Sequence, residues 1–180
     1  MIIVEIILCL VILISLILLV ILINKNKFYI YLIKINEAEN NIDLFLQEKL
    51  DLLNKCRPII GKAIKKDDFF ENIKDLNKSD YTHFELYNLL RDNYNELFDI
   101  LENNEKLFKK KNLDEILEEL NNNEEQLLAG IKFYNDSVVG YNELIHKFPS
   151  NLIRHFFGYD EKEFYKNEKR EIFEILKDIK

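Results

Sequence analysis

Apolar residues fill the beginning of the chain almost without interruption. Between Ile2 and Ile23 the only polar side chains are those of Glu5 and Ser15. As an α-helix this run extends about 33 Å, close to the roughly 30 Å thickness of the hydrocarbon part of a bilayer. The pattern predicts a single membrane-spanning helix within residues 1–27, with Glu5 as a boundary residue whose carboxylate reaches the interface.

Two other interpretations of this run are rejected. A cleaved signal peptide has a basic start, a shorter apolar stretch and small residues at the cleavage site, and this sequence lacks that pattern. A lipoprotein would be modified at Cys9, but Leu8 stands where a small residue normally precedes a lipidated cysteine.

Basic residues follow the apolar run and none precedes it. Lys25, Lys27 and Lys34 lie on the C-terminal side. The positive-inside rule therefore predicts an external N-terminus and a cytoplasmic C-terminal domain. Three aromatic residues supply an interfacial belt on the same side: Phe28, Tyr29 and Tyr31.

The next apolar positions alternate spacings of three and four, which is the pattern of a long packed helix. They are Ile35, Ala38, Ile42, Phe45, Leu52, Cys56, Ile59 and Ala63, with Lys49 as the polar outlier. Pro58 is expected to kink or split this helix, because it removes a backbone donor and clashes with the preceding turn. We expect the helix to end within residues 65–68, before a short mixed segment at 69–78.

Two further stripes have the same period. Ser79 or Asp80 is predicted to cap the first of them. Its apolar positions are Phe84, Tyr87, Leu90, Tyr94, Leu97, Leu101 and Phe108. After a polar break at residues 109–112, a third helix is predicted from these positions: Leu113, Ile116, Leu120, Leu127, Ile131, Tyr134, Val138, Tyr141, Ile145 and Phe148. Pro149 is expected to end it.

These stripes predict an all-α protein. Because long helices joined by short connections tend to be antiparallel neighbours, we expect an up-down, antiparallel bundle of three to four helices over residues 28–166. Residues 151–157 are predicted to form a short helix stopped by Gly158. A charged final helix is expected over 162–180, with 167–180 as a C-terminal extension.

Composition and charge exclude several classes of protein. The chain has only four Gly and two Pro, which argues against an all-β fold. Its formal net charge of −7, with acidic and basic residues interleaved, argues against nucleic-acid binding. Two cysteines give neither a disulfide framework nor a zinc-site spacing.

The C-terminal half carries a recognisable motif. Residues 133–145 read FYNDSVVGYNELI, and residues 147–153 read KFPSNLI. A Tyr-Asn pair thus recurs after seven residues and is followed by Phe-Pro. This stretch closely resembles the C-terminal signature of the LemA family, and residues 41–43, 51–53, 156–159 and 163–165 also look like family segments. The similarity covers most of the chain up to about residue 166.

The resemblance implies a membrane-tethered antiparallel helical bundle with no family catalytic residues to transfer. The sequence departs from the family at a basic cluster. Glu48 and Lys49 stand where the family usually has two arginines, Asn54 where it usually has proline, and Ile131 and Lys132 where arginine is common.

Six residues form the candidate interaction and packing motif: Tyr134, Asn135, Tyr141, Asn142, Phe148 and Pro149. The Tyr-Asn pairs lie about two turns apart on one side of the third helix. We interpret them as packing residues whose amides set helix register. A groove that binds a partner is the alternative.

A metal centre is the main chemical alternative. Glu143 and His146 have the Glu-x-x-His spacing of di-iron bundles, but such a site needs a second pair and two further glutamates. His83 follows Asp80 at the same spacing near a loop, and His155 has no acid three residues before it. Cys56 lies on an apolar stripe, where thiols are usually inert. We therefore predict no cofactor, no metal and no catalytic residue.

The function expected from these features is a non-enzymatic scaffold or adaptor at the bacterial cell membrane. Its predicted partners are the lipid bilayer and other membrane or cytoplasmic proteins. Two alternatives stay open. One is a di-iron-like bundle enzyme, and the other is a homo-oligomeric protein that organises the membrane.

Overall fold

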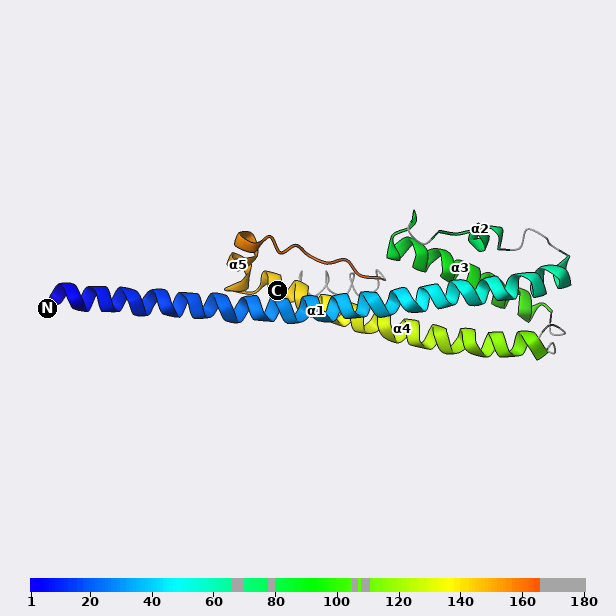
Figure 1. Ribbon diagram of the computed structural model, residues 1–180, viewed down its shortest axis with the longest axis horizontal. Coiled ribbons are helices and arrows are strands. Elements are labelled where there is room, and N and C mark those ends of the chain that lie inside the picture. The colour runs from blue at the N-terminus through cyan, green and yellow to red at the C-terminus, as the bar shows by residue number, and fades with distance from the viewer. Residues whose placement is uncertain (66–69, 78–79, 105–106, 108–110, 166–180) are drawn as a thin grey trace, which may run out of the picture. The chain divides into compact units, whose positions relative to one another are not determined.

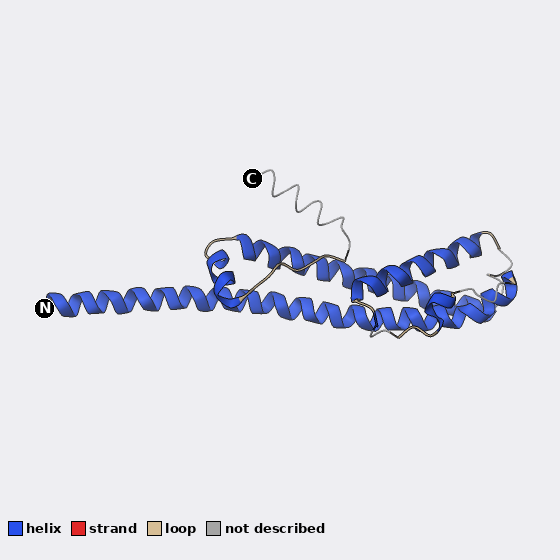
Figure 2. Cartoon of the chain, turned by 90° about the horizontal axis from the view of Figure 1, so that it is seen from above, coloured by secondary structure: helices blue, strands red, loops and turns tan. Residues whose placement is uncertain are grey.

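The computed structural model describes residues 1–65, 70–77, 80–104, 107 and 111–165. This part of the chain contains helices and no strand (Figures 1 and 2), so the predicted all-α class is confirmed. The helices are α1 (Ile2–Ile64), α2 (Glu71–Lys74), α3 (His83–Glu102), α4 (Lys111–His146) and α5 (Ser150–Phe157). They form two compact units, one from residues 1–37 and 133–180 and the other from residues 38–132. The predicted division at residues 27 and 166 stays a prediction.

Helix α1 continues without a break past the predicted span and through Pro58 (Figure 1). Of the two outcomes predicted at Pro58, a kink or a split, the split is therefore wrong and the kink stays a prediction. Cys56 and Ile60 on either side of it are fully buried, and this packing supports the helix where a hydrogen bond is missing. The helix ends at Ile64, before Lys65 with a φ of 57°, at the start of the range expected.

The N-terminal part of α1 is long and apolar enough to cross a membrane, judged by length and composition. No side chain from Ile2 to Ile23 is buried. The first buried residue is Asn24, and Phe28 follows it with its side chain fully covered. Among the residues that the structure describes, the apolar stretch thus has no protein partner along most of its length.

In the unit of residues 38–132, α1 packs against both α3 and α4. Gly130 of α4 lies beside Ile42, and Glu124 of α4 pairs with Lys49, so these two helices are antiparallel as expected. Helix α3 instead runs parallel to α1, since His83 near its start pairs with Asp43 and its last turn lies near Ile64. Because α3 is parallel to α1, the chain has to go back between Ile64 and His83 before α3 begins. The predicted up-down order did not include this return.

The buried positions of α1 differ from the predicted stripe. Ile59 and Phe45 are only half-buried and Ala63 is exposed. Four other apolar residues are buried in the same unit: Leu46, Leu50, Leu53 and Ile60. The predicted stripe followed one line along the helix, whereas α1 contacts two partner helices and buries a wider face.

Helix α3 begins at a capping box that the sequence analysis missed. The Thr82 Oγ1 accepts a hydrogen bond from the Glu85 backbone N–H at 3.3 Å, and the Thr82 N–H donates to the Glu85 carboxylate at 2.8 Å. Asp80 is therefore not the cap, and Ser79 lies outside the described residues. The Thr-x-x-Glu pattern at 82–85 was the available signal.

The boundaries of the later helices differ by a few residues from those predicted. Lys111 and Asn112 belong to α4 and not to a break, while Phe108 to Lys110 lie outside the described residues. Helix α4 ends at His146, which leaves Phe148 beyond it and exposed. Helix α5 is confirmed, and Gly158 ends it with a φ of 68°.

The core of the unit of residues 1–37 and 133–180 is small and aromatic. Its buried apolar residues are Phe28, Ile35, Tyr134, Val138, Tyr141, Ile145, Ile153 and Tyr165. After Gly158, residues 159–165 form neither helix nor strand and run as a drawn-out, extended segment (Figure 1). The predicted final helix is therefore wrong over 162–165, and its remainder, 166–180, lies outside the described residues.

Candidate functional site

The Asn142 side chain forms two hydrogen bonds with the backbone of one residue in the extended segment 159–165. Its Nδ2 donates to the Lys162 carbonyl oxygen at 2.9 Å, and its Oδ1 accepts from the Lys162 N–H at 2.9 Å. An extended chain leaves its backbone donor and acceptor unpaired, and a side-chain amide satisfies both. Asn142 itself is buried.

The first Tyr-Asn pair holds the same segment farther along. Asn135 Oδ1 accepts from the Tyr165 N–H at 3.1 Å, and the Tyr134 hydroxyl donates to the Glu163 carbonyl oxygen at 3.0 Å. The rings of Tyr134 and Tyr165 meet edge to face, with centroids 4.9 Å apart. These contacts bury Tyr165 against α4.

The seven-residue repeat matches the geometry of this contact. Asn135 and Asn142 are separated by about 10.5 Å along a helix that rises 1.5 Å per residue. Lys162 and Tyr165 are separated by three residues, or about 10 Å of extended chain. The two amides lie two helical turns apart on α4. They are therefore spaced to reach two backbone positions that lie three residues apart in the extended segment. In the part of the chain that the structure describes, the amides bind an extended segment of the same chain.

Tyr141 makes the helix-to-helix contact of this unit. Its ring meets Phe28 of α1 edge to face at 5.8 Å, and Tyr159 stacks on the other side of Phe28 at 4.3 Å. Burial, together with the nearby Tyr159 and Asp160, raises the pKa of Tyr141. A Cβ atom at Gly140 would lie 2.4 Å from the Tyr31 ring, so glycine lets this ring pack against α4.

Phe148 and Pro149 lie apart from the Tyr-Asn contacts, where α4 ends and α5 begins. Behind them Ser150 is buried and its hydroxyl donates to Asn24 Oδ1 of α1 at 2.7 Å. Asn24 Nδ2 donates to the Val20 carbonyl oxygen at 2.8 Å. This pair fixes the start of α5 beside the end of the apolar stretch, and Figure 1 shows α5 next to α1.

An apolar groove of about 610 Å³ opens between α1 and the segment of Phe148 and α5. Its wall on α1 consists of Leu16, Ile17, Val20 and Ile21. Its opposite wall consists of Phe148, Pro149, Leu152, Ile153, Phe156 and Phe157. All lining side chains are hydrocarbon or aromatic.

These features fall largely within a range that matches a known family. Residues 38–175 match the LemA family. The chain belongs to the LemA family. The predicted family is thereby confirmed, and the matched range contains both Tyr-Asn pairs, α5 and the extended segment, but not the apolar stretch of α1. No curated protein and no solved structure matches the chain.

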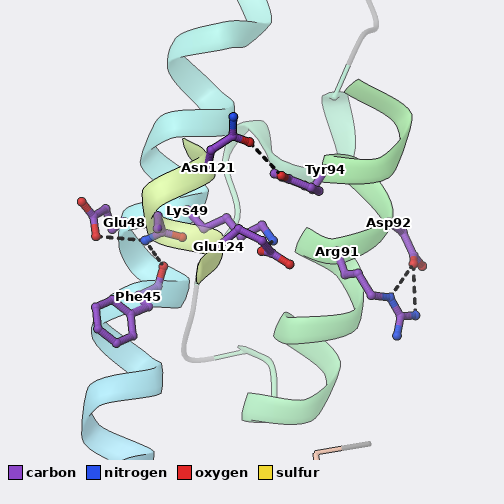
Figure 3. A network of polar contacts seen from close by, with 9 residues as sticks. Phe45, Glu48, Lys49, Arg91, Asp92, Tyr94, Asn121 and Glu124 are labelled. Atoms are coloured by element: carbon purple, nitrogen blue, oxygen red, sulfur yellow. Dashed lines mark hydrogen bonds and ion pairs between the residues drawn. The ribbon is translucent and has the colours of Figure 1, made fainter. Parts of the chain in front are cut away.

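The LemA-family chain carries a buried ion pair where it departs from the family's usual arginines (Figure 3). Lys49 is 1% exposed and pairs with Glu124, and its ammonium lies 4.3 Å from the centroid of the Tyr94 ring. Burial lowers the pKa of Lys49, and the hydrogen bond and charge of Glu124 oppose that shift. Lys49 stands out in the sequence as a polar residue on an apolar stripe, but its partners lie far away in the chain and no local pattern predicts them.

Two asparagines extend this network in the LemA bundle. The Tyr94 hydroxyl donates to Asn121 Oδ1 at 3.1 Å. Asn123 Nδ2 donates to the Phe45 carbonyl oxygen at 3.1 Å and to the Glu48 carboxylate at 2.9 Å. These pairs offset the cost of burying the polar groups and hold α1, α3 and α4 in one register. Asn123 Oδ1 is buried with no hydrogen-bond partner among the described residues.

Glu143 and His146, the Glu-x-x-His pair considered as an alternative metal site, bind different partners in the LemA chain. His146 Nε2 lies 2.9 Å from Glu161, while Glu143 lies 2.7 Å from Lys147. His83 pairs with Asp43 at 2.9 Å. Within the residues that the structure describes, no group of three or more His, Cys, Asp or Glu side chains could hold a metal ion.

Cys56 is fully buried in the LemA bundle. Burial raises the pKa of its thiol to about 12. A nucleophilic cysteine needs a lowered pKa and access to substrate, and Cys56 has neither.

Proposed function

We propose that this LemA-family protein is a non-enzymatic scaffold anchored in the bacterial cell membrane by the N-terminal part of α1. The observation that carries the proposal is α1 itself. One helix bears an exposed apolar stretch and then supplies Asn24, Phe28 and Ile35 to the core of its unit. An anchor and a protein core thus share one continuous helix.

The energetics of the apolar stretch favour a membrane. Burying one large aliphatic side chain contributes about 1.5–3 kcal/mol, and nearly all residues from Ile2 to Ile23 are aliphatic and uncovered. Leaving such a surface in water would cost tens of kcal/mol, far more than the stability of a typical domain. Lys25 and Lys27 follow at the end of the stretch, where basic residues favour the cytoplasmic face.

The scaffold assignment rests on the chemistry of the buried polar groups. Lys49, Asn123, Asn135 and Asn142 are all used in contacts within the chain. Glu143 and His146 pair with different partners. A surface of helices held in fixed register suits the binding of other membrane or cytoplasmic proteins.

Membrane fractionation tests the anchor. We expect the full chain to stay in the membrane pellet after an alkaline carbonate wash. Changing Ile12 and Leu16 to arginine should release it, because each arginine near the centre of a span costs about 2.5–3.5 kcal/mol. Leu44→Arg, at a position 68% exposed outside the stretch, is the matched control and should stay in the pellet. A wild-type chain in the soluble fraction would refute the anchor.

Metal analysis and affinity purification test the scaffold. The full chain purified from solubilised membranes should carry no stoichiometric iron, manganese or zinc and should recover protein partners at a fixed ratio. Bound metal at one or two ions per chain would replace the scaffold by a bundle enzyme. Crosslinks to further copies alone would favour the homo-oligomeric, membrane-organising alternative.

A further inference from the structure

Helix α5 has one apolar face that the described part of its unit does not cover. Ser150 and Ile153 are buried against the unit. Leu152 and Phe156 are spaced by four and lie on one side of α5, and Phe148, which precedes the helix, lines the same groove. The side chains of Leu152, Phe156 and Phe148 are 54%, 86% and 79% exposed. An exposed row of this kind marks a surface that contacts something apolar.

The position of the groove along α1 gives its depth in a membrane. The apolar stretch ends at Ile23. The wall of the groove on α1 begins at Leu16, seven residues before that end, and its last residue is Ile21, two residues before it. At 1.5 Å per residue the groove therefore extends from about 3 to about 10 Å beneath the end of that stretch. Helices that lie in the plane of a membrane interface bury their apolar face about 5–10 Å deep.

Positive charge lies beside the groove on the side where headgroups would be. The Lys25 ammonium is 4.3 Å from the centroid of the Phe157 ring, which belongs to the groove wall. Arg154 lies in the last turn of α5. A lysine over an aromatic ring at this level can also contact a lipid phosphate.

We propose that the groove holds an acyl chain of a membrane phospholipid, and that α5 is a second membrane contact lying in the interface beside the span. This inference rests on the proposed anchor. If α1 crosses the bilayer, one wall of the groove is already in hydrocarbon, where acyl chains are the most abundant partner. The groove volume of about 610 Å³ is within the range of ligand sites, and its lining offers no polar group to recognise anything else.

The absence of tryptophan from the sequence permits a direct test. Phe156→Trp places a single reporter on the exposed face of α5. The full chain is reconstituted in vesicles of phosphatidylcholine and phosphatidylglycerol whose acyl chains carry bromine at a shallow or a deep position. We expect shallow bromines to reduce the emission of Phe156→Trp several-fold and deep bromines to reduce it much less.

Two matched reporters separate this inference from the anchor. Leu13→Trp, in the middle of the apolar stretch, should be quenched by deep bromines, and Leu44→Trp should not be quenched. If Leu13→Trp is not quenched, the anchor fails. If Leu13→Trp is quenched while Phe156→Trp is not, the anchor stands and the lipid contact of α5 is refuted. This also holds if the emission of Phe156→Trp is blue-shifted, because the residue is then covered by a protein surface and not by lipid.

Mass spectrometry of the intact protein tests occupancy of the groove. The full chain in detergent, with phosphatidylglycerol added, should retain one phospholipid. Leu152→Asp with Phe156→Asp should reduce that fraction several-fold, and Leu44→Asp should leave it unchanged. Circular dichroism checks that each variant is folded. Equal retention by a folded double variant would overturn the proposal that the acyl chain occupies the groove.

Discussion

Asparagine is usually a residue of turns and caps, but here two asparagines hold an extended segment along a helix. Asn142 satisfies both backbone groups of Lys162, and Asn135 accepts from the backbone of Tyr165. Because each buried amide has a specific partner, replacing either one leaves polar groups without hydrogen bonds.

Asn142→Ala should release the extended segment from α4. The loss of two hydrogen bonds lowers the free energy of unfolding by about 1–3 kcal/mol. Hydrogen exchange on the full chain should show faster exchange of the amides in 159–165. Asn122→Ala, at an exposed position of α4, is the control and should leave that exchange unchanged. Unaltered exchange in Asn142→Ala would show that the rings alone hold the segment.

The Cys56 thiol should be nearly unreactive in the folded protein. A pKa of about 12, compared with an ordinary value of 9.0, gives a thiolate fraction about a thousandfold lower at about pH 8. In a Cys9→Ser background, we expect iodoacetamide to modify the unfolded chain rapidly. Because its thiolate fraction is lower, the folded chain should react at least about a hundredfold more slowly. Comparable rates would mean that the bundle around Cys56 opens readily.

At the scale of elements, local signals locate the helix ends and long-range packing determines which faces are buried. Thr82 caps α3 through the capping box with Glu85, and Gly158 ends α5 in the left-handed region. Tyr141, in contrast, depends on Phe28 from the other end of the sequence.

Thr82→Ala should destabilise α3. Removing the hydroxyl leaves the Glu85 N–H without its acceptor, and the loss of an N-cap lowers the free energy of unfolding by about 0.5–2 kcal/mol. Chemical denaturation of the full chain in detergent measures this loss, and Thr82→Ser should restore most of it.

Acidification should weaken the same cap. Two hydrogen bonds lower the pKa of Glu85 below its ordinary 4.5. The bond from the Thr82 N–H has the larger effect and the bond with the Thr82 hydroxyl the smaller. The pKa of Glu85 is lower in the folded protein than in the unfolded chain. The stability that the Glu85 charge contributes is therefore present above pH 4.5 and is lost as the pH falls through the lowered folded pKa. The stability difference between wild type and Glu85→Gln should therefore shrink on acidification. A difference that is constant with pH would exclude the charge of Glu85 from the cap.

Tyr141→Ala should strongly weaken the unit that contains Phe28. The substitution removes a buried ring and leaves a cavity, which typically costs about 3–5 kcal/mol. Thermal unfolding of the full chain should show a lowered midpoint, and Tyr141→Phe, which keeps the ring, should remain much closer to wild type. A midpoint within about two degrees of wild type would contradict the burial of this position.

At the scale of the whole molecule, the exposed apolar stretch determines the protein's proposed setting. Apart from Glu5 and Ser15 it is apolar on all sides, and it differs from the rest of α1, which buries one face and exposes another. A helix that is apolar all round requires an apolar environment on all sides.

The orientation of the span should place the C-terminal residues in the cytoplasm. Lys25, Lys27 and Lys34 follow the stretch, and Glu5 is the only charged side chain before or within it. A C-terminal alkaline phosphatase fusion, which is active only after export, should be inactive, and a C-terminal fluorescent protein should mature. The opposite pair of results would place the helical units outside the cytoplasm and would make envelope components their partners.

The sequence by itself determined the helical class, the apolar stretch, the stop at Gly158 and the LemA motif. Each of these depends on residues that are close together in the chain. Period-3.6 patterning, a glycine after a helix and a continuous apolar run act locally, so the order of residues is sufficient to predict them.

Only the tertiary structure decided what the buried polar residues contact. Lys49 finds Glu124, and Asn142 finds Lys162, across distances in sequence that no local pattern encodes. The parallel course of α1 and α3 has the same origin, because periodicity defines which face of a helix is apolar but not which helix covers it. Burying a polar group costs free energy unless a partner satisfies it, and that pairing forms only when the chain folds.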